Sequence, residues 1–320
     1  MDADGLEFPD GRRKENLISR REFSGGIAAL AAVSFVGSAD ASSGVSKGPR
    51  LSRARSASSE VILLGFGEAR DDSWFSPSVS SAFDGCDQLW LETAPPNLAP
   101  TSDAAVQAKL QQLSHTTSGT FYDCLTPEVR NRAMKRVSEL GIDQKEISSL
   151  RPWRAYNVIM SAYFRRHPQA ETKYVDQFLA KRAVAQGKKI GFEFPSTEAF
   201  FEFMAQMSPE AQDEYVSWLL TYLDEQDAGL NDRLPYDWAD GHPPRMTRSL
   251  KRMIDMPPLY AALQTHRNDW WANKIVELLK IDGHHFIGVG LLHTIGPASI
   301  PNRLKSLGVR LDEAGQGTRR

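Results

Sequence analysis

The chain has 320 residues, of which 41% are hydrophobic and 24% are charged, and its 38 basic and 40 acidic residues give a net charge of −2. This is the composition of an ordinary folded protein, which excludes collagen-like, coiled-coil and wholly disordered chains. The near-neutral charge gives no basic footprint of the kind that binds nucleic acids, so no nucleic-acid partner is expected. Two cysteines are too few for a disulfide-dense scaffold or a four-cysteine zinc site.

The first 41 residues contain the parts of an export signal in the right order. A charged start is followed by Ser-Arg-Arg-Glu-Phe at 19–23, an apolar run at 25–37 and the small-x-small cleavage site Ala39-Asp40-Ala41. The apolar run has 13 residues. A membrane-spanning helix needs roughly 20, so no stable membrane span is expected.

The paired arginines resemble the bacterial twin-arginine signal. This predicts passage through the twin-arginine translocase to a periplasmic or secreted location. The alternative is a basic tail in which the two arginines are adjacent by chance. Residues 42–59 are rich in serine and arginine and predict a disordered linker. One folded domain is expected over 60–312, with a flexible tail at 313–320.

Short apolar strands alternate with helices along this domain. Strands are expected at 61–65, 88–92, 189–193, 285–290 and 309–311. Helices are expected at 103–113, 127–140, 153–165, 174–186, 268–280 and 299–307, and residues 196–226 are expected to form one long helix or two broken ones. A loop is expected at 230–247, which is rich in Asp, Pro and Gly. The pattern is typical of an α/β protein with a mostly parallel sheet covered by helices.

Polar residues stand where several of these strands end. Glu68 follows the first strand, Glu92 and Glu193 end two others, and His293 follows the last long strand. Ligands of parallel sheets collect at the carboxyl ends of the strands. The sequence therefore predicts a functional site there, with a Gly-x-x-Glu segment early in the chain echoed by a Gly-x-x-His segment late in it.

Several segments, taken in order, resemble the TraB/GumN family. They are LWLET (89–93), LRPW (150–153), YVDQFLAKRAVAQGKKIGFEFPSTEAF (174–200) and HRNDWWANKIVELLKIDGHHFIGVGLLHTIGPASIPNRLKSLG (266–308). The last segment carries Arg267-Asn268 before a helix and Gly-x-x-His293 after a strand. The resemblance spans about residues 61–311. It implies the EreA/ChaN-like fold, which the TIKI metalloproteases share.

The resemblance also implies a metal-dependent hydrolase, and a peptidase in particular. In TIKI-type enzymes, two Gly-x-x-His histidines and a glutamate between them are the inferred metal ligands. His293 and Glu92 match this pattern here, whereas Glu68 replaces the first histidine. A carboxylate in that place shifts the preference toward harder ions such as Mn²⁺ or Mg²⁺, leaves Co, Fe and Zn open, or abolishes the site.

If a metal ion activates a water molecule, three further residues have candidate roles in the reaction. Glu193 is a candidate general base or a group that supports the ligands. Arg267 could neutralise an anionic intermediate, and Asn268 could orient a ligand. The substrate, a peptide or another small molecule, is left open.

Each candidate also has a plain structural alternative. His293 could be a hydrogen-bonded structural histidine, Arg267 a partner in a structural ion pair, and Asn268 a helix cap. Glu92 and Glu193 could cap helices, and Glu68 could be a solvated loop residue. Two further functions follow from these alternatives. The first is a catalytically degenerate family member that acts as a binding protein. The second, ranked lower, is a haem- or iron-binding periplasmic protein.

Three residue pairs give local predictions. His284 and His285 precede a strand, and alternation would point them to opposite faces. Trp270-Trp271 predicts one core residue and one half-exposed neighbour on a helix. Cys86 and Cys124 could form a disulfide or remain two free thiols.

Overall fold

The computed structural model describes residues 48–67, 69–94, 104–168, 174–230, 233–244 and 246–314. The expected export signal, the start of the expected linker, the candidate ligand Glu68 and residues 315–320 lie outside the described residues. Among the residues that are described, no helix has the length and apolar character needed to cross a membrane.

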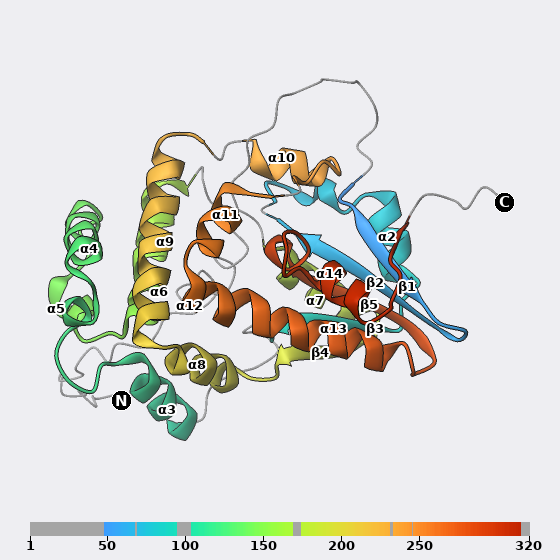
Figure 1. The fold of residues 1–320 in the computed structure, drawn as a ribbon, viewed down its shortest axis with the longest axis horizontal. Helices are drawn as coiled ribbons and strands as arrows, with labels where there is room; N and C mark the ends of the chain where they lie inside the picture. Colours follow the sequence, from blue (N-terminus) through green and yellow to red (C-terminus); the bar gives the residue numbers. More distant parts are fainter. Residues whose placement is uncertain are drawn as a thin grey trace, which may run out of the picture.

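A six-stranded sheet forms the centre of the fold, in the order β4-β3-β5-β2-β1-β6 (Figure 1). The strands are β1 (Leu51–Arg55), β2 (Ser59–Phe66), β3 (Gln88–Thr93), β4 (Lys189–Phe194), β5 (Gly283–Gly290) and β6 (Asp312–Ala314). The strands from β4 to β2 pair in parallel, whereas β1 pairs antiparallel with both β2 and β6. The sheet is therefore mixed, with a parallel core from β4 to β2 and an antiparallel edge formed by β1 and β6.

The antiparallel edge also corrects two boundaries. Strand β1 lies inside the expected linker. The sequence does not predict this strand, because its two buried residues, Leu51 and Ala54, are separated by polar residues and form no apolar run. The last strand follows the expected position at 309–311 instead of occupying it. Val309 and Leu311 pack against the core as partly buried residues, and the pairing with β1 begins only at Asp312.

Helices make up most of the remaining described chain. They are α2 (Pro77–Asp84), α3 (Ala104–Ser114), α4 (Pro127–Glu139), α5 (Gln144–Ser148), α6 (Pro152–Arg166), α7 (Val175–Ala185), α8 (Thr197–Gln206), α9 (Pro209–Asp227), α10 (Leu234–Ala239), α11 (Arg248–Ile254), α12 (Pro257–Tyr260), α13 (His266–Leu278) and α14 (Ile300–Ser306). Short 3-10 helices are η2 (Asp72–Trp74), η3 (Phe121–Cys124) and η6 (Leu291–His293), and a π-helix, η5 (Ala261–Thr265), precedes α13.

The structure decides one helical alternative and corrects one loop. Residues 196–226 form two helices, because Ser208 caps α9 by accepting a hydrogen bond from the Ala211 amide, and Pro209 begins the new helix. The expected loop at 230–247 contains α10. Its Trp238 is buried and donates from Nε1 to the Gly65 carbonyl oxygen at 2.8 Å, which anchors the helix beside β2.

The sheet has helices on both faces, as strand alternation requires. On one face, residues such as Leu64, Leu89 and Phe286 join a large core that includes side chains of α2 and α7. On the other face, Val61 and Ile287 pack with side chains of α13 and α14 in a smaller core. The parallel strands therefore end between two helical layers, and α13 covers the face on which the candidate site lies.

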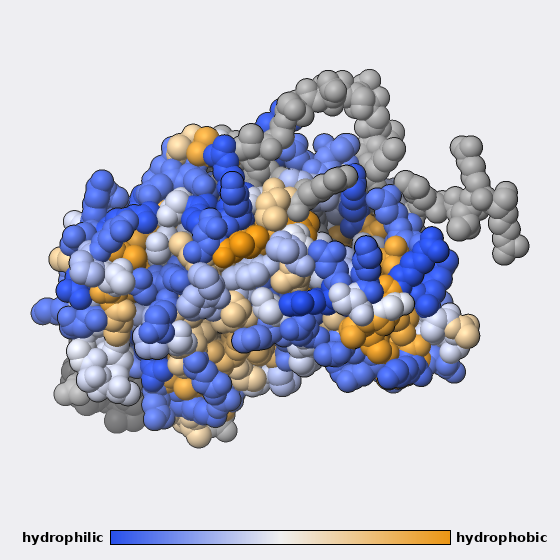
Figure 2. All heavy atoms as spheres, viewed as in Figure 1, coloured by the Kyte–Doolittle hydropathy of each residue, from blue (hydrophilic) through white to orange (hydrophobic). Residues whose placement is uncertain are grey.

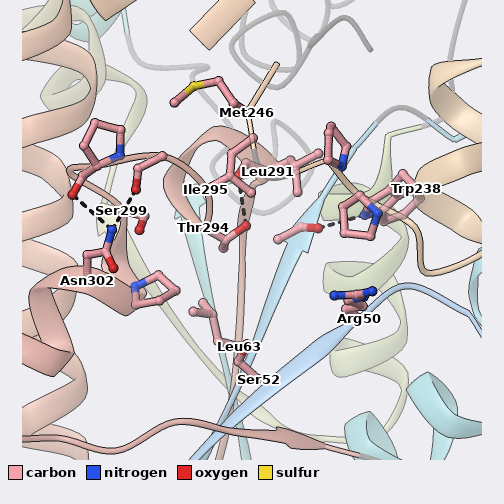
Figure 3. A pocket seen from close by; sticks show the side chains of 16 residues that line it. Arg50, Ser52, Leu63, Trp238, Met246, Leu291, Thr294, Ile295, Ser299 and Asn302 are labelled. Carbon is pink, nitrogen blue, oxygen red and sulfur yellow. Dashed lines mark hydrogen bonds between the residues drawn. The ribbon is translucent and has the colours of Figure 1, made fainter. Parts of the chain in front are cut away.

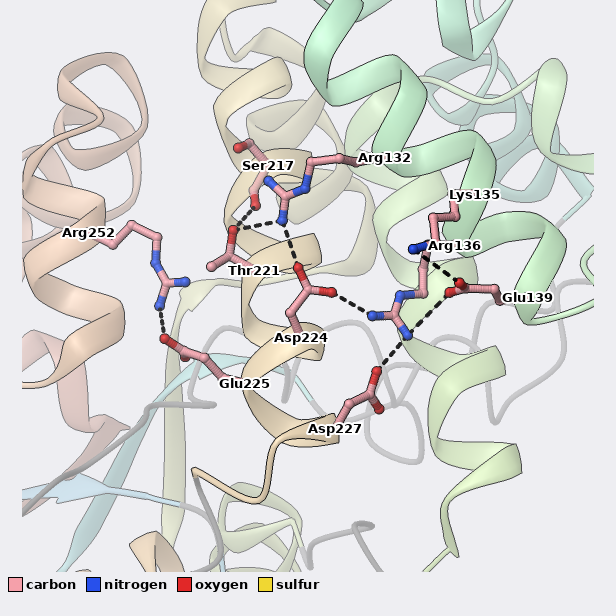
Figure 4. Close-up of polar contacts among 10 residues, drawn as sticks. All are labelled: Arg132, Lys135, Arg136, Glu139, Ser217, Thr221, Asp224, Glu225, Asp227 and Arg252. Carbon is pink, nitrogen blue, oxygen red and sulfur yellow. Dashed lines mark hydrogen bonds and ion pairs between the residues drawn. The ribbon is translucent and has the colours of Figure 1, made fainter.

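Beyond the sheet, α4 is joined to α9 by a network of charged side chains (Figure 4). Arg136 donates to Asp224 at 2.6 Å and to Asp227 at 2.7 Å, and Arg132 donates to Asp224 at 3.0 Å. Tyr163 of α6 donates to the other oxygen of Asp227 at 2.9 Å. The network ties three helices together at the far end of the molecule, away from the sheet in Figure 1.

The paired residues lie as their patterns predict where the structure tests them. His285 is buried at 4% exposure, whereas the side chain of His284 is 56% exposed. Trp271 is fully buried and Trp270 is 36% exposed, which confirms the division expected on that helix. Both cysteines, Cys86 and Cys124, are free thiols.

The face of the molecule drawn in Figure 2 is covered mostly by hydrophilic residues.

We expect Gly65→Ala to destabilise the fold, because β2 ends directly against Thr294. A Cβ at Gly65 would lie 2.2 Å from Thr294 Oγ1 and 2.8 Å from its Cγ2, which is closer than these atoms can pack. The free energy of unfolding, measured by urea denaturation, should fall by about 1–3 kcal/mol. Adding Thr294→Ala should recover part of that loss. A Gly65→Ala protein as stable as the parent would contradict this packing.

Candidate functional site

Two glutamates lie side by side at the carboxyl ends of neighbouring parallel strands. The register of β3 against β4 pairs Leu91 with Phe192 and Thr93 with Phe194, which places Glu92 beside Glu193. Alternation turns Leu91 into the larger core, so the two carboxylates point to the opposite face, under α13. Two like charges at adjacent positions repel each other and need a compensating cation.

Arg267 of α13 supplies that cation. Its Nη2 donates to Glu92 Oε2 and to Glu193 Oε2 at 2.6 Å each, and its Nε donates to Glu193 Oε1 at 2.8 Å. Only 4% of the Arg267 side chain, 13% of Glu92 and 6% of Glu193 are exposed. One helix turn further on, Trp271 Nε1 donates to Glu193 Oε2 at 2.9 Å. The fork of the guanidinium thus holds Glu193 through both of its oxygens.

The same contacts determine the charge of the cluster. Burial opposes ionisation of Glu92, but the positive charge of Arg267 and the His293 ring more than offset burial and hold the Glu92 pKa well below its usual range. Burial likewise opposes the charge of Arg267, and the two glutamates more than offset it and raise the Arg267 pKa. Arg267 and Glu92 are therefore both charged near neutral pH.

His293 reaches this cluster from η6, which directly follows β5. The ring Nδ1 lies 2.6 Å from Asn268 Oδ1, and the ring Nε2 lies 3.6 Å from Glu92 Oε2. The other oxygen of Glu92 accepts a hydrogen bond from the Gly290 amide at 2.5 Å. In the Gly-x-x-His segment, the amide of Gly290 thus positions the Glu92 carboxylate, and the ring of His293 faces that carboxylate.

The orientation of Asn268 fixes where the histidine carries a proton. Asn268 Nδ2 donates to the Ala298 carbonyl oxygen at 2.8 Å, an acceptor that the amide oxygen could not approach. The amide oxygen must then face His293, so Nδ1 is the donor in that contact. Nε2 is left facing the Glu92 carboxylate. There it carries a second proton or, if it carries none, has a lone pair to offer a cation.

The backbone before Arg267 is unusual. The π-helix η5 runs directly into α13, so one wider turn precedes Arg267 and Asn268. Gln264 in that turn is 4% exposed, and its Oε1 lies 3.5 Å from Asn268 Nδ2. Single π turns inside helices are rare and occur often at functional sites. Here the π turn precedes Arg267 and Asn268, the two polar residues of α13 that contact the site.

The described residues supply part of the expected metal site. Glu92 Oε2 and His293 Nε2 converge, and a histidine whose Nδ1 is held by a hydrogen bond is the usual form of a metal ligand. In the described ranges, however, no three His, Cys, Asp or Glu side chains are grouped so that they could hold a metal ion. The third expected ligand, Glu68, lies outside those ranges. Arg267 also contacts the same Glu92 oxygen that a metal would need.

Five of the six candidate site residues therefore lie in one buried cluster. These are Glu92, Glu193, Arg267, Asn268 and His293.

Three neighbours were missed by sequence reasoning. The Trp270-Trp271 pair predicts only one core residue and one half-exposed neighbour, and Gln264 carries no signal in the sequence. Asp176, in the first turn of α7, is partly buried, and burial together with the charge of Glu92 raises its pKa to about 6. An acidic residue at a helix start is common, so nothing in the sequence marked Asp176.

A model of the TraB/PrgY/gumN family matches residues 51–313 of the chain. This range begins at the first residue of β1 and ends within β6, so it covers the sheet except for the last residue of β6. Comparison with curated proteins and with solved structures gave no match.

Arg267→Ala should strongly destabilise the protein. The substitution leaves Glu92 and Glu193 buried and adjacent without a counter-charge, and breaking a buried ion pair on one side typically costs about 3–5 kcal/mol. Urea denaturation at neutral pH measures the loss. Arg303→Ala, which removes a partly exposed arginine paired with Asp269, is the matched control and should lose at most about 1 kcal/mol. Equal losses in the two variants would refute a special role for Arg267.

Proposed function

Because the chain belongs to the TraB/PrgY/gumN family, we propose that it is a metal-dependent hydrolase whose site lies around Glu92 and His293. One observation supports this most directly. Glu92 Oε2 and His293 Nε2 face each other at 3.6 Å, while Asn268 keeps the opposite ring nitrogen protonated. A pair of this kind is suited to hold a divalent cation or to handle a proton.

The ligands of the proposed ion are Glu92 and His293, with Glu68 as the third ligand that the resemblance implies. A bound cation would lower the pKa of a water molecule and polarise the carbonyl group of a substrate. Ligands dominated by carboxylate oxygen favour Mn²⁺ or Mg²⁺ over softer ions, with Co, Fe and Zn as further candidates. The proposed substrates are peptides or other small molecules with a carbonyl group that water can attack.

The other residues of the cluster position these ligands. Asn268 orients the His293 ring, as residues behind metal ligands generally do. Both oxygens of Glu193 are occupied by Arg267, and one also accepts from Trp271. This occupancy favours a supporting role for Glu193 over that of a general base. Arg267 brings positive charge next to Glu92, where an anionic intermediate could develop.

A second candidate function is a binding protein without catalysis. Arg267 Nη2 already lies 2.6 Å from Glu92 Oε2, so the carboxylate has a cationic partner whether or not a metal is present. A family member that has Glu68 in place of a histidine could keep this ion pair as a purely structural feature. The two candidates differ in one property, which is whether the folded protein binds a divalent cation.

We also propose that the chain is exported through the twin-arginine translocase to the periplasm or beyond. The support is the order of the charged start, the arginine pair, the apolar run and the cleavage site within residues 1–41.

Metal content distinguishes the two candidate functions. The mature protein, its His293→Ala variant and the control variant His284→Ala, which changes an exposed histidine, would be analysed by elemental mass spectrometry after incubation with Mn²⁺. The hydrolase proposal predicts about one equivalent of metal in the parent and the control and a large loss in His293→Ala. No bound metal in the folded parent would overturn that proposal in favour of the binding protein.

A further inference from the structure

A separate cavity of about 680 Å³ opens beside the candidate site (Figure 3). It lies between the start of β1, the end of β2, the loop after η6 and the start of α14, and the segment after α10 closes another side. This volume falls within the roughly 300–1,000 Å³ that pockets for small molecules occupy. None of the five described site residues lines it.

The walls of the cavity are mostly apolar. They include Leu63, Trp238, Met246, Leu291 and Ile295 together with four prolines. Such a lining favours an apolar ligand body, because contact with these side chains removes apolar surface from water.

Hydrogen bonds hold these walls in place. Trp238 donates from Nε1 to the Gly65 carbonyl oxygen at 2.8 Å, and Asn302 Nδ2 donates to the carbonyl oxygens of Gly296 and Pro297 at 2.9 and 3.2 Å. These contacts, two of which are drawn at Asn302 in Figure 3, connect α10 to β2 and α14 to the loop after η6. The cavity is therefore preformed, so a ligand would lose little binding free energy in ordering it.

Two hydroxyl groups in the cavity are available to a ligand. Ser299 is only 3% exposed, stands at the position that precedes α14, and makes no capping hydrogen bond with its side chain. Ser52 of β1 also lines the cavity. Neither hydroxyl is used in a hydrogen bond with the described residues. A hydroxyl group that lines a cavity can donate to, or accept from, a polar atom of a ligand or water.

Arg50 gives the cavity a positive charge at its rim. It is the one charged side chain among the described residues that line the cavity. Its Nε donates to the Gly241 carbonyl oxygen at 2.8 Å, which fixes the guanidinium in position, while its Nη1 has only a loose, exposed ion pair with Glu313 at 3.7 Å. The remaining N–H groups of the Arg50 guanidinium, at the rim of an apolar cavity, can donate hydrogen bonds to both oxygens of a carboxylate.

We propose that this cavity binds an apolar organic acid, with the hydrocarbon body against the apolar walls and the carboxylate at Arg50. The inference concerns binding alone and does not depend on the proposed hydrolase activity. The cavity is nevertheless adjacent to the candidate site, since Leu291, which begins η6, and Thr294, which directly follows His293, both line it.

Titration calorimetry with octanoate and with 1-octanol, which has the same chain but no charge, tests the proposal. We expect saturable binding of octanoate with a Kd on the order of 0.1–1 mM. Arg50→Gln should weaken octanoate binding roughly tenfold and leave 1-octanol binding unchanged. The matched control is Arg165→Gln, which removes an exposed arginine of α6 that does not line the cavity, and it should bind both compounds like the parent.

Ser52→Phe is a second variant, designed to fill the cavity without removing charge. It should abolish binding of both compounds while the melting temperature shows a folded protein. The proposal is overturned if the folded parent shows no saturable binding of octanoate, or if Arg50→Gln weakens both compounds equally. Octanoate binding that persists unchanged in Ser52→Phe would also overturn it.

Discussion

The site depends on one electrostatic constraint, the neutralisation of two carboxylates that neighbouring parallel strands place side by side. Glu92 and Glu193 cannot both remain charged and buried unless a cation lies against them. Arg267 meets this requirement with two contacts of 2.6 Å, and it can do so only if α13 lies across the ends of β3 and β4. Trp271 on the same helix contacts Glu193 as well. The ion pair therefore positions α13 on the sheet.

The position of α13 in turn determines the state of His293. Asn268 follows Arg267 in the chain and is anchored by the Ala298 carbonyl, so its amide oxygen is presented to the histidine ring. The ring then directs Nε2 at Glu92. The ion pair of Arg267 thus places α13, and the placement of α13 in turn orients the His293 ring through Asn268. The loop from Thr294 to Ser299 connects this arrangement to the neighbouring cavity, because Ala298 lies within a segment that lines it.

The sequence predicted much of this arrangement because the relevant residues follow strands. Glu92, Glu193 and His293 each stand at or just after the end of an apolar strand, and the ends of parallel strands meet at one edge of a sheet. The family resemblance added Arg267 and Asn268, which lie on a helix and carry no strand signal. The sequence leaves two roles open for Arg267, neutralising an anionic intermediate or forming a structural ion pair. The structure shows that it forms a buried ion pair with Glu92 and Glu193.

Other features could not be predicted because their cause is tertiary. Strand β1 has two apolar residues separated by polar ones, and only its pairing with β2 and β6 makes it a strand. Helix α10 lies in a segment rich in Pro and Asp and is anchored by the burial of Trp238 against Gly65. The π turn before Arg267 has no sequence signature, since its residues suit an ordinary helix equally well.

The orientation of the His293 ring follows from all of these contacts, and the position of its proton can be measured. Nitrogen-15 NMR of histidine-labelled protein distinguishes a proton on Nδ1 from one on Nε2, and the His293→Ala variant assigns the signal. We predict that the neutral His293 ring carries its proton on Nδ1, because Asn268 Oδ1 accepts from it, and that Asn268→Ala removes this preference. A neutral His293 ring with its proton on Nε2 in the parent protein would contradict it.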